Sequence, residues 1–348
     1  MSDSNAAENL TTTKSKGSSN KLRSVTLLFL LSGLSSLIYQ VIWTRQMVFV
    51  FGSSTFASAT VISAFMGGLA IGSFIAGKYA DKIRNPFLCY GILEGVIGVW
   101  AIMAPFMFEA ALPLYKMFWQ QFHFSVLPFS VLRFCVVSLI LLPPTACMGA
   151  TLPLLSKFVT SSLSVVGNRV GTLYSINTLG AVSGALISGF YLIPAHGLFV
   201  STMIAAATNI LLAVLVFLLN KELNAEPATI PEESAELNIP DDSDRAIENI
   251  KQETTISKQA LFTIIAFGNS GAIAKINEVA WTRALLLVIG STTYAFSIML
   301  STFLIGIFIG SFVCAKYVDQ FKNAYFSFSV LQVLLGLAGL ASICLFNY

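Results

Sequence analysis

Long apolar runs separated by short polar segments dominate the chain. Each run has roughly 20 residues, enough for an α-helix rising about 1.5 Å per residue to cross a hydrocarbon core of about 30 Å. Lipid offers the backbone no hydrogen-bond partner, so runs of this length are predicted to be helices. The pattern predicts nine membrane spans: Ser24–Trp43, Phe56–Tyr79, Phe87–Leu112, Leu127–Met148, Val170–Ile193, Leu198–Leu219, Gln259–Ala280, Thr293–Tyr317 and Ala324–Phe346.

The composition indicates that lipid surrounds most of the chain. Of the 348 residues, 55% are hydrophobic and only 11% are charged, whereas soluble domains average about 25% charged residues. The mean hydropathy is +0.78. The predicted fold class is therefore an all-α integral membrane protein.

The polar segment 1–23 precedes the first apolar run, which is too long for the core of a signal peptide. We expect this segment to be a retained, disordered cytoplasmic tail. Basic residues gather there and in alternate loops, such as Lys78 and Lys82 after the second span. The positive-inside rule then places the N-terminus in the cytoplasm.

An internal repeat relates two segments that lie 238 residues apart. Ser32–Asp81 aligns with Ser270–Asp319 without a gap, and about two in five positions are identical. Shared membrane composition would not align Trp, Arg, Gly and Asp residues in one register, so the pattern indicates duplication. The matches include Trp43-Thr44-Arg45 with Trp281-Thr282-Arg283, Gly52-Ser53 with Gly290-Ser291, and Lys78-Tyr79 with Lys316-Tyr317.

The two copies are predicted to have the same orientation, because an even number of spans separates the start of the first copy from the linker. Parallel six-helix halves are the plan of major facilitator transporters. We therefore expect a major-facilitator-like bundle, with a six-helix first repeat in residues 24–220 and three helices of a truncated second repeat in residues 258–348. A fragment and a truncated gene product both fit this pattern.

Residues 221–257 separate the repeats and contain ten of the 17 acidic residues. This segment has too few large apolar side chains to fold alone. It is predicted to be a solvated cytoplasmic linker, with a docking site for a partner as the alternative.

Two local patterns bear on helix packing. Small residues at four-residue spacing let helix backbones approach closely, and they occur as the pairs Gly68 and Gly72, Gly180 and Gly184, and Gly306 and Gly310. Prolines remove a backbone donor and clash with the preceding turn. A broken helix is therefore expected at Pro143, Pro144 and Pro153, either as a structural kink or as a place where freed carbonyls coordinate a ligand.

Ionisable residues inside spans are costly and are the best functional candidates. Glu278 lies near the end of the seventh span with Arg283 five residues on, and the first copy has Gln40 and Arg45 at the matching positions. A carboxyl group there could carry a proton or neutralise a cationic substrate. The alternative is a local ion pair with Arg283 or Lys275.

Glu94 lies in the middle of the third span, and Arg133 in the fourth span is its candidate partner. Its counterpart in the second copy is the neutral amide Gln332. The two copies therefore differ in charge at two polar positions, in opposite senses. Such asymmetry suits a substrate or proton site between two halves, although neutral drift would give the same pattern.

The residue pattern does not indicate a disulfide, metal, nucleotide or catalytic site. The five cysteines form no C-x-x-C pair and His123 and His196 stand alone, so neither a disulfide framework nor a metal site is predicted. The glycine clusters lie within apolar runs rather than in a βαβ unit, and no nucleophile elbow or Walker loop is present. No enzyme activity, cofactor or nucleic-acid partner is expected.

Three stretches resemble the membrane region of bacterial fused major facilitator/spermidine synthase-like proteins: Ser32–Arg45, Leu141–Leu155 and Gly171–Gly197. In that family a membrane bundle usually precedes a cytoplasmic aminopropyltransferase-like domain with a methyltransferase-type fold. No segment of this sequence resembles that domain. The resemblance implies a multi-pass protein of the bacterial inner membrane.

The family pattern usually has Glu before its Val-x-Trp-x-Arg element, whereas the first copy here has Gln40. The turn from Gly77 to Arg84 also resembles the cytoplasmic loop motif of major facilitators. That resemblance implies a gating role for Asp81, Lys82 and Arg84, and for Asp319 in the second copy.

Two functions remain open from the sequence. The first is an inner-membrane transport module for a polyamine or related organic cation, with Glu94 and Glu278 as charged contacts. The second is a membrane anchor or regulatory module for a spermidine synthase-like enzyme. The expected partners are the lipid bilayer together with a small organic cation, a spermidine synthase-like soluble domain, or a second copy of the chain.

Overall fold

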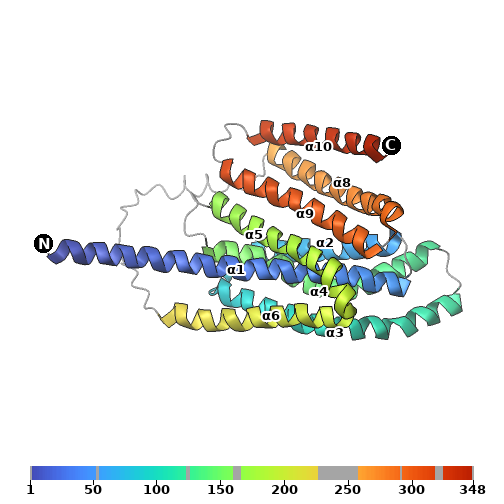
Figure 1. Ribbon diagram of the computed structural model, residues 1–348, viewed down its shortest axis with the longest axis horizontal. Helices are drawn as coiled ribbons and strands as arrows, with labels where there is room; N and C mark the ends of the chain where they lie inside the picture. The colour runs from blue at the N-terminus through green and yellow to red at the C-terminus, as the bar shows by residue number, and fades with distance from the viewer. Residues whose placement is uncertain are drawn as a thin grey trace, which may run out of the picture. The chain divides into compact units, whose positions relative to one another are not determined.

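The computed structural model describes residues 2–51, 55–122, 126–159, 166–225, 258–290, 292–317 and 324–346, and every regular element within them is helical. A 3-10 turn at Ala80–Lys82 follows α2, and a π-helical turn at Ser188–Leu192 joins α5 to α6. The α-helices (Figure 1) are α1 Ser2–Phe51, α2 Thr55–Tyr79, α3 Pro86–Phe122, α4 Val126–Val159, α5 Val166–Ile187, α6 Ile193–Ala225, α8 Lys258–Ile289, α9 Thr292–Tyr317 and α10 Ala324–Phe346.

The chain divides into two compact units. The first contains residues 1–221 and 279–320, and the second contains residues 222–278 and 321–348. This division differs from the predicted boundaries between repeats, because α9 packs on α5 of the first repeat. Most of the acidic linker, residues 226–257, lies outside the described residues.

Helix ends follow the internal repeat. The ends of α1 at Phe51 and α8 at Ile289 lie 238 residues apart, which is the offset of the sequence repeat. The same offset relates the ends of α2 and α9 at Tyr79 and Tyr317. After α8, Gly290 has a φ of 72° and its N–H bonds to the Leu286 carbonyl, as expected for a glycine that ends a helix.

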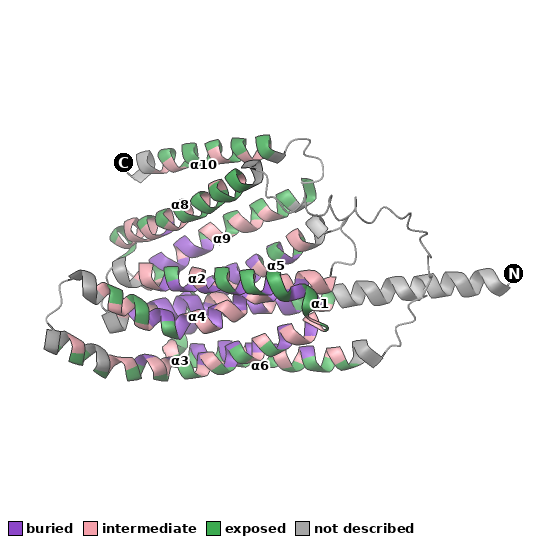
Figure 2. Ribbon diagram, turned by 180° about the vertical axis from the view of Figure 1, so that it is seen from behind, coloured by how far each residue is buried: buried purple, intermediate pink, exposed green. Residues whose placement is uncertain are grey.

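The core of the first unit lies where α1, α2, α4 and α5 meet. Here α1 packs on α5, α5 on α9, and α2 on α4, and Figure 2 shows buried residues concentrated along these helices. Large aromatic side chains fill the centre, where the rings of Tyr39 and Trp43 stack with centroids 5.2 Å apart. Trp43 also packs against Phe65 of α2.

Glycines set the closest helix crossings in this unit. A Cβ atom added at Gly72 would lie closer than 3.0 Å to the backbone of Ala146 in α4, and one at Gly180 would lie equally close to the backbone of Leu30 in α1. Gly68 and Gly184 are similarly tight, against Thr145 and Leu34. By contrast, nothing lies within 4 Å of such an atom at Gly306 or Gly310.

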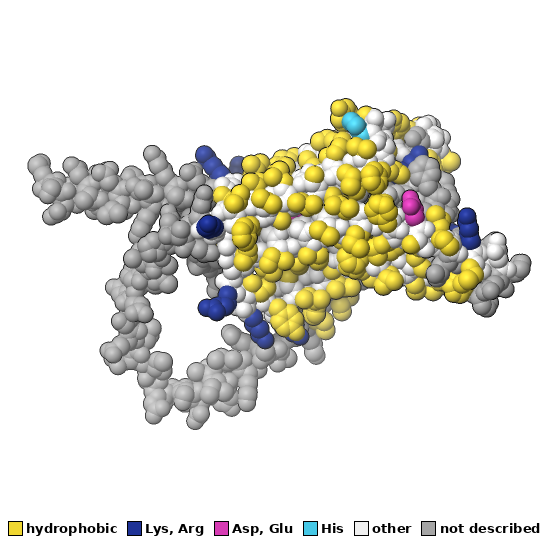
Figure 3. Space-filling model, turned by 90° about the horizontal axis from the view of Figure 1, so that it is seen from below, with side chains coloured by type: hydrophobic (Ala, Val, Ile, Leu, Met, Phe, Trp, Pro, Cys, Tyr) yellow, Lys and Arg dark blue, Asp and Glu magenta, His cyan; other side chains and the backbone are white. Residues whose placement is uncertain are grey.

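Seven helical segments among the described residues are long and apolar enough to cross a membrane. One of them, residues 170–221, covers two of the predicted spans because α6 follows directly on the π-helical turn. The predicted span Gln259–Ala280 is not among these seven segments. On the face in Figure 3, hydrophobic side chains cover most of the surface and Lys and Arg side chains gather towards its ends.

The N-terminal part of α1 and the kink in α6 can be compared with the sequence prediction. Residues 2–22, predicted to belong to a disordered tail, continue α1 as a helix, and extension of a formed helix is easier than nucleation of a new one. The predicted boundary between the fifth and sixth spans coincides with a kink. Gly197 breaks α6 there with φ 75° and ψ 177°, a conformation that favours glycine.

The expected break in α4 is absent, since this helix runs from Val126 to Val159 with three prolines inside it. Neighbouring helices satisfy carbonyls that these prolines free. Trp100 Nε1 of α3 donates to the Ile140 carbonyl, four residues before Pro144, at 2.9 Å. Ser73 Oγ of α2 donates to the Gly149 carbonyl, four residues before Pro153, at 2.8 Å.

We expect Ser73→Ala to destabilise the protein by roughly 1 kcal/mol, because the Gly149 carbonyl would lose its donor. Ser183→Ala is the matched control. The Ser183 hydroxyl donates to the Leu179 carbonyl. Ser183 is not a proline, so its backbone N–H can still bond to this carbonyl when the hydroxyl is removed. Thermal unfolding of the purified protein in detergent should show a lower midpoint for the first variant only, and equal midpoints would contradict the assigned bond.

Candidate functional site

A fully buried carboxyl group lies among α1, α3 and α6. Glu94 of α3 is 0% exposed. Its Oε1 accepts a hydrogen bond from Ser32 Oγ of α1 at 2.5 Å, and its Oε2 accepts one from Asn209 Nδ2 of α6 at 2.5 Å. Both oxygens are therefore held by neutral donors, each from a different helix.

The same network continues along α1. Tyr39 donates its hydroxyl hydrogen to Asn209 Oδ1 at 3.1 Å, and seven residues separate it from Ser32, which puts both on one helix face. Gln40 is also buried, and its Nε2 has no hydrogen-bond partner among the described residues. Ser32 and Tyr39 of α1 thus join Asn209 in a chain of donors and acceptors that ends at Glu94.

Close packing of α3 against α6 brings Asn209 to this carboxyl group. A Cβ atom at Gly91 or Gly98 of α3 would lie closer than 3.0 Å to side-chain atoms of Val216 or Ile210 in α6. Larger residues at these glycines would push the helices apart and lengthen the bond between Asn209 and Glu94. Glycine spacing on α3 therefore positions the site.

Glu94 has other partners than the sequence suggested. The structure gives it Ser32 and Asn209 rather than Arg133 of α4, which is half-buried. Sequence reasoning missed both partners, although Asn209 is an amide inside an apolar run and could have been singled out on the same grounds as Glu94.

Glu278 forms an ion pair within its own helix. Its Oε2 lies 2.5 Å from Lys275 Nζ, one turn earlier on α8. Of the two interpretations that the sequence left open, this contact corresponds to the local ion pair, and Lys275 is a partner in it.

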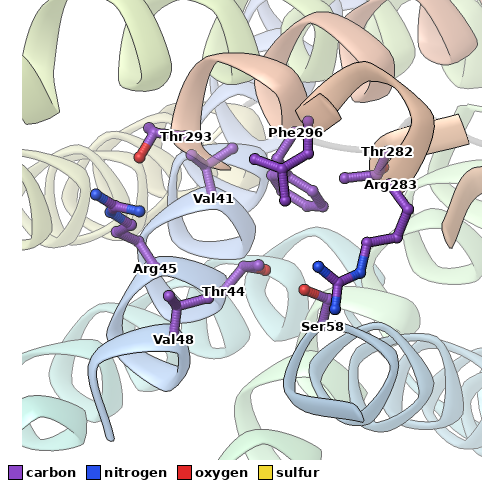
Figure 4. A pocket seen from close by; sticks show the side chains of 10 residues that line it. Val41, Thr44, Arg45, Val48, Ser58, Thr282, Arg283, Thr293 and Phe296 are labelled. Atoms are coloured by element: carbon purple, nitrogen blue, oxygen red, sulfur yellow. The ribbon is translucent and has the colours of Figure 1, made fainter. Parts of the chain in front are cut away.

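A pocket in the first unit brings together the duplicated Thr-Arg elements. Thr44 and Arg45 of α1 and Thr282 and Arg283 of α8 all line it. Figure 4 shows their side chains around the pocket together with Ser58 and Thr293. The repeat-related arginines thus border one space, although they are 238 residues apart in the chain.

The predicted gating loop lies at the end of α2. Asp81 is exposed, with a carboxylate oxygen 3.9 Å from Lys157 Nζ of α4, a distance and exposure at which an ion pair contributes little. Lys157 also donates to the carbonyls of Ala80 and Ile83 and so ties α4 to the turn that follows α2. Lys82 and Arg84 are exposed, and Asp319 lies outside the described residues.

The chain resembles one curated protein at low identity. It is 22% identical over 181 residues to polyamine aminopropyltransferase 1 of Streptomyces coelicolor. The alignment covers 52% of this chain and 31% of the relative, so the chain spans less than a third of the relative's length. No family model matches the chain. The likeness is to a spermidine synthase-like protein, and the helices are compatible with a membrane location.

Proposed function

We propose that the chain is a membrane-embedded transport module that moves a polyamine or a related organic cation and carries a proton at Glu94. The single observation that carries the proposal is the complete burial of Glu94 within the bundle. The weak likeness to a polyamine aminopropyltransferase supports the choice of substrate class.

Burial of an ionised carboxyl group at this position is costly. Removing an ionised carboxylate from water costs several kcal/mol in real proteins, and hydrogen bonds from neutral donors compensate only part of that cost. Among the described residues, no Lys, Arg or His forms an ion pair with Glu94. Costly intramembrane acids of this kind mark proton relays and substrate paths.

The enclosure of Glu94 favours a proton over an organic cation as its immediate ligand. A proton needs almost no space, whereas a polyamine would have to displace Ser32 or Asn209 to reach the carboxyl group. The proposed cycle therefore requires the three helices to separate before substrate reaches this depth. Protonation would remove the charge and weaken the two hydrogen bonds that hold α1 and α6 to α3.

A membrane anchor for an aminopropyltransferase is the second candidate. It is favoured by the name of the relative and by the part of that relative which lies outside the alignment. In this case the bundle would place an enzyme at the membrane, and Glu94 would serve only to specify helix packing.

Reconstitution of the purified chain in liposomes distinguishes transport from membrane anchoring. Proteoliposomes with the purified chain should take up labelled spermidine and change the signal of an internal pH dye, while protein-free liposomes should do neither. If the chain moves neither spermidine nor protons but copurifies with aminopropyltransferase activity, the anchor is the better account.

A further inference from the structure

A row of polar side chains runs along α1 within its apolar segment. Ser32, Ser36, Gln40 and Thr44 follow one another at four-residue spacing. Residues four apart are neighbours on a helix surface, so the row is continuous and extends over about 18 Å at 1.5 Å per residue. Ser36 is half-buried and the other three side chains are buried. We call these four residues the polar ridge.

The polar ridge connects Glu94 with a pocket. At one end, Ser32 Oγ donates to Glu94 Oε1 at 2.5 Å. At the other end, Thr44 lines the pocket in Figure 4, whose volume of about 40 Å³ exceeds the roughly 10–15 Å³ that one water molecule needs. Arg45 and Thr293 line both this pocket and a second one of about 480 Å³. The ridge thus leads from a space that can hold water to the buried carboxyl group.

Hydrogen bonds within α1 account for the hydroxyl groups of the ridge. Ser36 Oγ donates to the Ser32 carbonyl at 2.8 Å, and Thr44 Oγ1 donates to the Gln40 carbonyl at 2.7 Å. Such bonds are common for hydroxyl groups in helices and need no function. Each hydroxyl oxygen can still accept a hydrogen bond, however, because it has two lone pairs.

Two buried donors beside these hydroxyl groups are not accounted for in this way. Gln40 Nε2 and Trp43 Nε1 have no hydrogen-bond partner among the described residues, and their side chains are 1% and 0% exposed. Trp43 lies seven residues after Ser36, which places it on the same helix face. A buried donor without an acceptor costs about 1–3 kcal/mol. Buried water molecules satisfy polar groups of this kind in other proteins.

We propose that water molecules bound by Gln40 and Trp43 complete a proton path along the polar ridge, from the pocket at Thr44 to Glu94. Water and hydroxyl groups both donate and accept hydrogen bonds, so each group on the path receives one proton and passes on another. The proton that leaves Ser32 converts the Glu94 carboxylate to a carboxyl group, and water in the pocket replaces it. The path rests on the proposed role of Glu94 as a proton carrier, but not on the identity of the transported cation.

Hydrogen–deuterium exchange at Glu94 tests the path without any need for transport. The purified chain in detergent, at a pH low enough to protonate this carboxyl group, is mixed into deuterated buffer. The carboxyl C=O stretching band that is missing in Glu94→Gln moves to lower frequency as deuterium replaces the proton, and its shift is followed with time. Gln40→Leu should slow this shift about tenfold, the factor that corresponds to loss of one hydrogen bond on the path.

Two further variants make the exchange experiment decisive. Gln120→Leu is the matched control, because it makes the same substitution at an exposed position of α3, and it should exchange like the unchanged protein. Ser36→Ala should slow exchange in the same way as Gln40→Leu, and it tests the path if that variant does not fold. Thermal unfolding shows which variants are folded.

The outcomes for the path and for transport are distinguishable. Slow exchange in the ridge variants supports the path even if the chain moves no spermidine, which would contradict the proposed function alone. The path is overturned if folded Gln40→Leu and Ser36→Ala exchange as fast as the unchanged protein. It is also overturned if the band of the unchanged protein does not shift in deuterated buffer.

Discussion

Glu94→Gln should reduce spermidine uptake and the accompanying proton signal to the level of protein-free liposomes, while the protein still folds. An amide has nearly the shape of a carboxyl group, and its oxygen can still accept a hydrogen bond from Ser32 or Asn209. Its stability should therefore stay within roughly 1 kcal/mol of the unchanged protein. The amide group cannot bind or release a proton near neutral pH, however, so the coupling of spermidine uptake to proton movement should be abolished.

The matched control for this variant lies on the same helix. Glu109 of α3 is exposed, so Glu109→Gln removes one carboxyl group without disturbing the buried network. We expect uptake by Glu109→Gln to equal that of the unchanged protein. Full uptake and proton movement by Glu94→Gln would remove this carboxyl group from the mechanism.

Gly72→Ala should destabilise the first unit by roughly 1–3 kcal/mol, the usual cost of overpacking. The added methyl group would meet the backbone of Ala146 closer than 3.0 Å, and a backbone atom cannot avoid it by changing rotamer. The crossing of α2 and α4 would have to open. The same movement would strain the bond between Ser73 and the Gly149 carbonyl.

The internal repeat provides the control for this second variant. Gly310 occupies the position matching Gly72 in the other copy, and nothing lies within 4 Å of a Cβ atom added there. Because alanine favours helix over glycine by about 1 kcal/mol, Gly310→Ala should be neutral or slightly stabilising. Thermal unfolding in detergent measures both, and equal loss of stability in the two variants would contradict the close crossing of α2 and α4.

Much of the helical fold could be predicted because apolar runs of roughly 20 residues favour helices, which satisfy their backbone hydrogen bonds internally. Helix positions follow from the length of the apolar runs, and the repeat register set at Trp43 and Trp281 reappears in the helix ends at Phe51 and Ile289. The effect of the α4 prolines on the helix could not be predicted from the local sequence. Whether a freed carbonyl breaks a helix depends on donors such as Trp100 and Ser73, which come from other helices.

The site was predictable only in part, because its contacts also come from other helices. The cost of an intramembrane acid singled out Glu94, but its partners depend on which faces of α1 and α6 turn towards α3. The duplicated arginines were visible in the sequence, yet it took the packing of the first unit to place Arg45 and Arg283 on one pocket. Pairwise contacts between distant segments are not encoded in the spacing within either segment.

Infrared difference spectroscopy of the reconstituted protein tests the central claim most directly, because a protonated carboxyl group has its own C=O stretching band. Adding spermidine at constant pH should change this band in the unchanged protein and in Glu109→Gln, and the change should be missing in Glu94→Gln. A difference spectrum that is the same in Glu94→Gln as in the unchanged protein would show that the proton is carried elsewhere.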